Sequence, residues 1–253
     1  MVVLQATSLR RRAMRARGVG RHGRRRSGAP HCPIAAPQRE QPMAAPTPFR
    51  MTVCGLDELP GHCAAGVTHV LSILDPEMPA PSAPADCQRL ELRFHDVIEP
   101  SANMHPPGPE HVRGILGFGR ELLAAPNADA HLVVHCHAGV SRSTAAMLLI
   151  LAQAEPGRPA AELAAELLRI RAKAWPNLRI VEFGDQMLGR GGTLIGAAAA
   201  IYRHQLEQRQ HLAEVMIGSG RGREIAAAQA GNGRAGDGRE PGRDGERPAA
   251  TVR

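Results

Sequence analysis

Aromatic side chains are scarce in this sequence: they make up 2% of its 253 residues, with one Trp, one Tyr and four Phe. The hydrophobic core must therefore be built from Leu, Ile, Val, Ala and Met, and the hydrophobic content of 43% is sufficient for one. No run of 18 apolar residues occurs, so we expect no segment to span a membrane. An apolar stretch behind the N-terminal arginines is also missing. Its absence argues against a secretory signal, and we expect a cytoplasmic protein.

Paired cysteines are missing as well. The five cysteines, at positions 32, 54, 63, 87 and 136, are odd in number and show no regular spacing. This argues against a disulfide framework, and the absence of any Cys-x2-Cys pair argues against a structural zinc site. His95, His105 and His111 have no carboxylate or cysteine at helical spacing, so we interpret them as surface histidines. We expect neither a metal nor a cofactor.

Lysine occurs once, at Lys173, whereas Arg, Ala, Gly and Pro are abundant. This bias is typical of a GC-rich genome and favours a bacterial source. The positive charge is concentrated at the N-terminus, where residues 1–26 contain nine Arg and no acid. Residues 49–217 contain 14 basic and 18 acidic residues, a net charge of about −4. A nucleic-acid-binding role for the whole protein is therefore disfavoured, and only the basic N-terminal tail could contact nucleic acid.

The composition divides the chain into three parts. Residues 1–48 are rich in Arg, then in Pro and Ala, and we expect disorder there. Residues 49–217 are predicted to form one folded domain, and residues 218–253, rich in Gly and Arg, a disordered tail. Met43 and Met51 are alternative initiators, which leaves open whether residues 1–42 belong to the native protein.

Within the central part, strand patterns alternate with helix patterns. Predicted strands cover residues 51–54, 68–74, 89–94 and 131–136; predicted helices cover 56–65, 109–125, 143–154, 159–174, 178–188 and 194–216. Residues 127 and 129 mark a turn. The alternation predicts an α/β fold with a central, mostly parallel sheet of four or five strands flanked by helices.

The most informative segment is His135-Cys136-His137-Ala138-Gly139-Val140-Ser141-Arg142-Ser143-Thr144. Cys136 ends a predicted strand, and a helix follows Arg142. The backbone N–H groups of residues 137–142 can curl around one anion, and Gly139 permits the backbone angles that such a curl needs. The N-terminus of the helix adds its positive end. The guanidinium of Arg142 can bind two phosphate oxygens.

The same positive environment is expected to lower the pKa of Cys136 and make it a nucleophile. Ser143, in the first helical turn, can donate a hydrogen bond to the thiolate and help it leave. His135 can order the loop from behind. His137 faces the mouth of the loop, where contact with substrate and simple solvation are both open.

The pattern His135-Cys136-x-x-Gly139-x-x-Arg142-Ser143 resembles the active site of the protein tyrosine phosphatase superfamily, in its dual-specificity-like bacterial form. Phe94-His95-Asp96 and Leu188-Gly189-Arg190-Gly191-Gly192 resemble flanking segments of such bacterial proteins. The resemblance covers roughly residues 50–200. It implies a phosphatase-like fold and hydrolysis of phosphorylated protein through a phosphocysteine, on phosphotyrosine and possibly also phosphoserine or phosphothreonine, without a metal.

The resemblance also implies a general acid on a separate loop. Asp96, at the end of a predicted strand, is the candidate, and Asp75, which also follows a strand, is the competitor. Asn177 either braces the loop, as the resemblance implies, or caps the following helix; both interpretations stay open. The oligomeric state and the physiological substrate stay open as well.

Two other functions remain as alternatives. One is an inactive phosphatase that binds phosphoprotein without turning it over. The other is a rhodanese-type sulfurtransferase, which also uses a cysteine loop at the edge of an α/β sheet. Rhodanese loops usually have four residues between the cysteine and the closing arginine, whereas five separate Cys136 from Arg142 here.

Overall fold

The computed structural model describes residues 49–82, 84–124 and 129–230. Four parallel strands form one sheet in the order β1-β4-β2-β3. Their bounds are β1 (Arg50–Cys54), β2 (His69–Leu74), β3 (Gln88–Arg93) and β4 (His131–His135). The predicted α/β fold with a mostly parallel sheet is confirmed: within the described ranges the sheet has four strands, all of them parallel.

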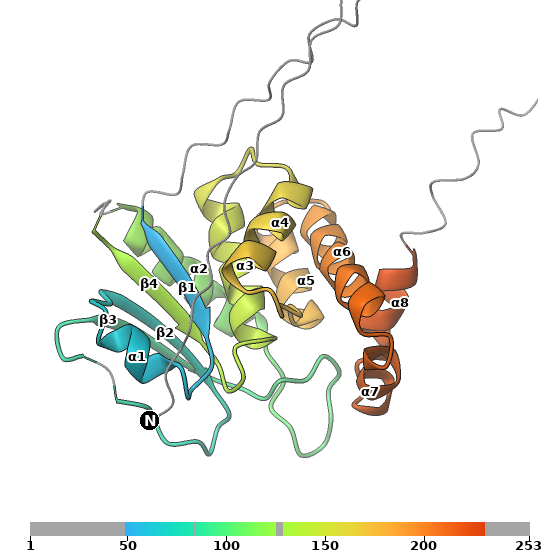
Figure 1. Ribbon diagram of the computed structural model, residues 1–253, viewed down its shortest axis with the longest axis horizontal. Helices are drawn as coiled ribbons and strands as arrows, with labels where there is room; N and C mark the ends of the chain where they lie inside the picture. The colour runs from blue at the N-terminus through green and yellow to red at the C-terminus, as the bar shows by residue number, and fades with distance from the viewer. Residues whose placement is uncertain (1–48, 83, 125–128, 231–253) are drawn as a thin grey trace, which may run out of the picture. The chain divides into compact units, whose positions relative to one another are not determined.

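The helices lie on both faces of this sheet, mostly on one (Figure 1). Their bounds are α1 (Leu59–Cys63), α2 (Pro109–Ala124), α3 (Arg142–Ala154), α4 (Ala160–Ile170), α5 (Leu178–Met187), α6 (Thr193–Gln208), α7 (Leu212–Gly218) and α8 (Gly222–Ala230). Of the described helices, α1 alone packs on one face, through Leu59 against Val70 and Val133. The other face carries the main core, to which α2, α3, α4, α5, α6 and α8 contribute.

Alternation along the strands explains the two cores. In β4, Leu132 and Val134 belong to the main core, whereas Val133 between them faces α1. A strand buried on both faces has few polar positions, and all five residues of β4 are buried. Helix α3 is buried over most of its surface as well. The segment that joins β4 to α3 is therefore held at both ends by the centre of the molecule.

Several predicted bounds need correction. The helix expected over 159–174 ends at Ile170, because the chain leaves the helix to run past the loop after β4. The helix expected over 194–216 is interrupted between Gln208 and Leu212 and forms two helices. The first predicted helix, over 56–65, is reduced to the five residues of α1. The predictions for residues 1–48, 127 and 231–253 fall outside the described residues.

The disordered tail expected from residue 218 is wrong for residues 222–230, which form α8. This helix buries Ile225 and Ala228 in the main core. Because Gly, Arg and Ala dominate the composition of the tail, the short segment of good helix formers within it was not predicted as a helix. The predicted domain boundary at residue 217 is therefore too early, and the folded part extends at least to residue 230.

The Gly-rich turn at residues 188–192 serves the start of α6. Gly192 has a φ of +89°, in the left-handed region. The buried carboxylate of Asp185 accepts hydrogen bonds from the N–H groups of Gly192 (2.6 Å) and Leu194 (2.8 Å). It thereby satisfies donors that the first turn of a helix leaves unpaired.

Candidate active site

The loop of residues 137–142 joins β4 to α3, and its carbonyl groups point outward. The carbonyl of residue 137 accepts from Leu56 N (3.0 Å), and those of residues 138 and 139 accept from the Arg171 guanidinium (3.2 and 2.9 Å). Those of residues 140 and 141 accept from Trp175 N (2.8 Å) and Asn177 N (3.3 Å). In a trans peptide the N–H points opposite to the carbonyl, and the described chain has no cis bond.

The N–H groups of residues 138–142 therefore face the inside of the loop. No acceptor among the described residues is hydrogen-bonded to them. The N-terminus of α3 adds the positive end of its dipole at the same place. A ring of convergent N–H groups of this kind can bind an anion, so this geometry is compatible with the phosphate-binding role predicted for the loop from His137 to Arg142.

Cys136 lies at the base of this loop, where β4 ends. Its Sγ atom is 3.2 Å from the Oγ of Ser143, a pair of buried side chains in hydrogen-bond contact. Behind the loop, Nε2 of His135 is 2.7 Å from the Oγ of Ser72 in β2. Burial lowers the pKa of His135 below its usual value, which favours the neutral ring. His135 therefore ties the end of β4 to the neighbouring strand β2.

Arg142 is 3% exposed and reaches across the end of the sheet. Its Nη1 atom donates to the carboxylate of Asp75 (2.5 Å) and to the carbonyl of Phe94 (2.6 Å). Its Nε atom is buried and has no hydrogen-bond partner in the described part of the chain. A buried guanidinium N–H without a partner costs free energy, so the Nε edge of the Arg142 guanidinium is available for an anion.

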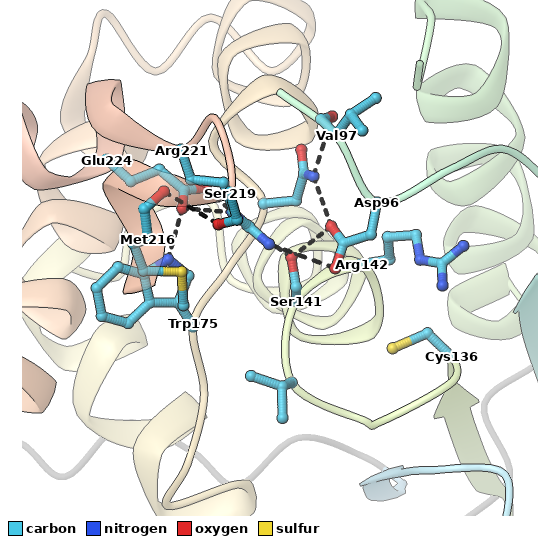
Figure 2. Close-up of polar contacts among 12 residues, drawn as sticks. Asp96, Val97, Cys136, Ser141, Arg142, Trp175, Met216, Ser219, Arg221 and Glu224 are labelled. Atoms are coloured by element: carbon cyan, nitrogen blue, oxygen red, sulfur yellow. Dashed lines mark hydrogen bonds and ion pairs between the residues drawn. The ribbon is translucent and has the colours of Figure 1, made fainter. Parts of the chain in front are cut away.

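Asp96 lies beside Ser141 at the start of α3, and its carboxylate does not point at the sulfur of Cys136 (Figure 2). Its Oδ1 atom accepts from Ser141 Oγ (2.7 Å) and Asn177 Nδ2 (2.8 Å), and its Oδ2 atom is 3.4 Å from Nη1 of Arg221. The side chain is 30% exposed. The structure thus brings Asp96 to the loop but holds its carboxylate with three side chains, whereas Asp75 contacts the loop arginine directly.

Asn177 makes contacts that fit both of the tasks considered for it. Its Oδ1 atom accepts from Ile180 N (3.2 Å) and caps α5. Its backbone N–H donates to the carbonyl of Ser141, and its Nδ2 atom also reaches the carbonyl of Val97 (3.3 Å). His137, by contrast, is exposed and has no hydrogen bond from its ring to any described residue.

Two pairs of residues around the loop were missed by sequence reasoning. Glu58 pairs with Arg171 (2.7 Å), and Glu224 pairs with Arg221 (2.8 Å). The pKa of Glu58 is lowered to about 2, and the hydrogen bond from Arg171 is the largest cause. Both pairs lie outside the cysteine loop in sequence. Only the Arg221-x-x-Glu224 spacing, which puts opposite charges on one helical face, could have signalled one of them.

Burial lowers the pKa of the Arg221 guanidinium, but its hydrogen bonds to Glu224 and the charge of Asp96 outweigh that effect and raise the pKa overall. Burial also raises the pKa of the Cys54 thiol, at the end of β1, to about 12. Cys54 therefore stays a protonated core thiol.

No group of three or more potential metal ligands occurs among the described residues. Likewise, no helix in that part of the chain is long and apolar enough to cross a membrane.

No family model matches the chain, and no curated protein matches it at a significant level. Solved structures of dual-specificity and tyrosine phosphatases are similar to it. Human DUSP28 has a TM-score of 0.43 and 17% identity, and the match covers 58% of this chain and 96% of that one. The human tyrosine phosphatase-like serine/threonine/tyrosine-interacting protein has a TM-score of 0.42 and 18% identity, covering 55% and 87%. DUSP15 has a TM-score of 0.42 and 21% identity, covering 63% and 91%.

Proposed function

We propose that this chain is a cysteine-dependent phosphomonoester hydrolase of the tyrosine phosphatase superfamily that acts on phosphorylated protein. Phosphotyrosine is the first candidate substrate, with phosphoserine and phosphothreonine as further ones. The observation that carries the proposal is that the segment from Cys136 to Arg142 combines a thiol at its base, five inward-facing N–H groups and an Arg142 Nε that is buried without a partner in the described part of the chain. A dianionic phosphate satisfies these donors, and the sulfur lies at the base of the loop that would hold it.

In the proposed reaction, the Cys136 thiolate attacks phosphorus and the bond to the leaving oxygen breaks. The loop N–H groups and Arg142 stabilise the charge that builds up on the phosphoryl oxygens. Asp96 gives its proton to the leaving oxygen, for which its carboxyl must turn away from Ser141 and Asn177. Asp96 then takes a proton from water, which attacks the phosphocysteine and releases phosphate. Ser143, 3.2 Å from the sulfur, stabilises Cys136 as the leaving thiolate.

The test is release of phosphate from p-nitrophenyl phosphate by the full chain, followed by a panel of phosphotyrosine, phosphoserine and phosphothreonine peptides with phospholipids as a comparison. We expect turnover of the aryl phosphate, unaffected by EDTA, and preference for phosphotyrosine peptides. Release of thiocyanate from thiosulfate and cyanide, without phosphate release, would instead establish the sulfurtransferase.

A second candidate function is a phosphoprotein-binding module without turnover. The observation that favours it is the position of Asp96, whose carboxylate is occupied by Ser141, Asn177 and Arg221. If that arrangement persists when substrate binds, no acid protonates the leaving group. Micromolar binding of a phosphopeptide by the wild-type chain, without measurable hydrolysis of it or of p-nitrophenyl phosphate, would favour this module over the enzyme.

A further inference from the structure

Arg221 lies behind the phosphate-binding loop, at the residue before α8, and is 8% exposed. Its Nη2 atom donates to Ser141 Oγ (2.8 Å), and its Nη1 atom is 3.4 Å from Asp96 Oδ2. Figure 2 shows this side chain reaching from the C-terminal helices to the start of α3, where Ser141 and Asp96 meet. One guanidinium thus contacts both the loop and the candidate acid.

Glu224 fixes the orientation of this guanidinium. The fully buried carboxylate of Glu224 accepts from Nε and Nη2 of Arg221, both at 2.8 Å. It also accepts from Trp175 Nε1 (2.5 Å) and Leu178 N (3.1 Å). The backbone N–H of Trp175 donates in turn to the carbonyl of Val140 in the loop. Arg221 is therefore anchored to the same segment that braces the loop from outside.

The Ser141 hydroxyl transmits this orientation to Asp96. A hydroxyl has a single proton to donate. Because Arg221 donates to Ser141 Oγ, the hydroxyl proton is directed to Asp96 Oδ1, 2.7 Å away. Arg221 thus acts on Asp96 twice, through the ion pair with Oδ2 and through the Ser141 hydroxyl to Oδ1. Removing the Arg221 side chain leaves Oδ2 of Asp96 without its ion pair and lets the Ser141 hydroxyl rotate.

We propose that Arg221 is a positioning residue of the phosphatase reaction, which from α8 holds Asp96 and the Ser141 end of the phosphate-binding loop in place. The inference rests on the proposed function and assigns a task to a segment beyond the predicted domain boundary. Arg suits this position because its planar fork can serve Ser141, Asp96 and Glu224 at once, which the single ammonium of lysine cannot do.

The test compares Arg221→Gln and Arg221→Lys with the same changes at Arg223. Arg223 lies two residues further on and pairs with Glu99 and Glu182 at the surface, where its side chain is 47% exposed. It is a matched control because exposed pairs of this kind contribute little. Arg221→Lys keeps a positive charge beside buried Glu224, so it serves as the variant that folds if Arg221→Gln does not.

With p-nitrophenyl phosphate, we expect Arg221→Gln to lower kcat about tenfold to a hundredfold, the effect of a small misplacement of a reacting group, with little change in KM. Arg221→Lys is expected to lower kcat less, and the Arg223 variants to stay within about twofold of wild type. Wild-type kcat in folded Arg221→Lys and Arg221→Gln proteins would overturn the inference.

A double-mutant cycle with Asp96→Asn separates positioning from a purely structural role. If Arg221 acts through Asp96, then Arg221→Lys lowers kcat in the wild type but much less in the Asp96→Asn background. An equal loss of kcat in both backgrounds would refute the proposed route. A structural role alone would lower the melting temperature and leave the two effects on kcat additive.

Hydrogen exchange keeps the inference testable if the proposed function fails, that is, if wild type shows no phosphatase activity. Arg221→Lys should then speed exchange at residues 95–98 and 137–142, whereas Arg223→Lys should not. Unchanged exchange in these two segments would show that Arg221 does not hold them.

Discussion

Gly139 lies directly against the backbone at the end of β1, next to Cys54. A Cβ atom placed on Gly139 would be 2.5 Å from the carbonyl oxygen of Cys54 and 2.6 Å from the nitrogen of Gly55. Its φ of +65° is in the left-handed region as well. The loop of residues 137–142 can therefore close on β1 only with glycine at this position, for reasons of both contact and conformation.

Gly139→Ala is predicted to distort the loop and abolish phosphate binding. A left-handed φ costs a residue with a Cβ about 1–2 kcal/mol, and the collision with Cys54 and Gly55 adds to that cost because backbone atoms cannot step aside. Gly189→Ala is the matched control, since its φ is +63° but nothing lies within 4 Å of a Cβ there. Urea unfolding and isothermal titration with inorganic phosphate would measure the two effects.

The control variant, Gly189→Ala, is expected to lose only the stability that the left-handed φ costs a residue with a Cβ, and to keep its affinity for phosphate. Equal losses of stability in the two variants would mean that the contact between Gly139 and Cys54 is unimportant.

The fold and the loop were predictable from the sequence because local signals for them agree. The apolar strand pattern before Cys136, the glycine at residue 139 and the helix after Arg142 each point to the same strand-to-helix junction, and the structure contains it. Strand positions were also predicted within one residue, because β-branched and apolar residues follow each other closely in β2 and β4.

The surroundings of the loop could not be predicted, since they depend on contacts between distant segments. Arg171 contacts Glu58, which is 113 residues away in the sequence, and Arg221 contacts Ser141, which is 80 residues away. Charged residues such as these look like solvated surface in the sequence, because exposure is the usual state of Arg and Glu. Helix α8 was missed partly for the same reason: besides Ile225 and Ala228, its buried contacts involve two charged residues, Glu224 and the preceding Arg221.

Cys136→Ser is predicted to abolish hydrolysis of p-nitrophenyl phosphate while the fold and phosphate binding persist. Serine has nearly the same shape, and its hydroxyl can still contact Ser143, but it is a far weaker nucleophile than a thiolate. Initial rates and circular dichroism would check both parts. Cys63→Ser, a change of a partly buried cysteine on α1, is the control and should keep wild-type rates. Turnover by the Cys136 variant at the wild-type rate would exclude a phosphocysteine mechanism.

The pair of Glu58 and Arg171 is predicted to make stability depend on pH at the acidic end. The hydrogen bond from Arg171, and then that from Gly55 N, lower the pKa of Glu58 from 4.5 to about 2. Because the folded-state pKa is the lower one, the stabilisation is present above about pH 4.5 and is lost as the pH falls toward 2. Glu58 is 44% exposed, so solvent screening limits the contribution to about 1 kcal/mol.

Glu58→Gln should therefore lower the free energy of unfolding at pH 7, and the difference from wild type should narrow as the pH falls to 3. Urea unfolding at several pH values measures it. Glu207→Gln, a change of an exposed glutamate on α6 that makes no ion pair with a described residue, is the control. A difference that stays constant down to pH 3 would contradict the assigned role of the Glu58 carboxylate.

Asp96→Asn and Asp75→Asn are predicted to act on different kinetic constants, and this difference identifies the general acid. If Asp96 protonates the leaving oxygen, Asp96→Asn lowers kcat by about 10²–10⁴ and flattens the limb of the pH profile on which the acid loses its proton. Asp75 instead supports Arg142 from 2.5 Å, so Asp75→Asn should mainly raise KM and weaken phosphate binding. Steady-state kinetics from pH 5 to 8 separates the two outcomes. A flattened limb in Asp75→Asn, together with an unchanged limb in Asp96→Asn, would make Asp75 the general acid. The carboxylate of Asp96, held by Ser141, Asn177 and Arg221, would then be a brace of the loop.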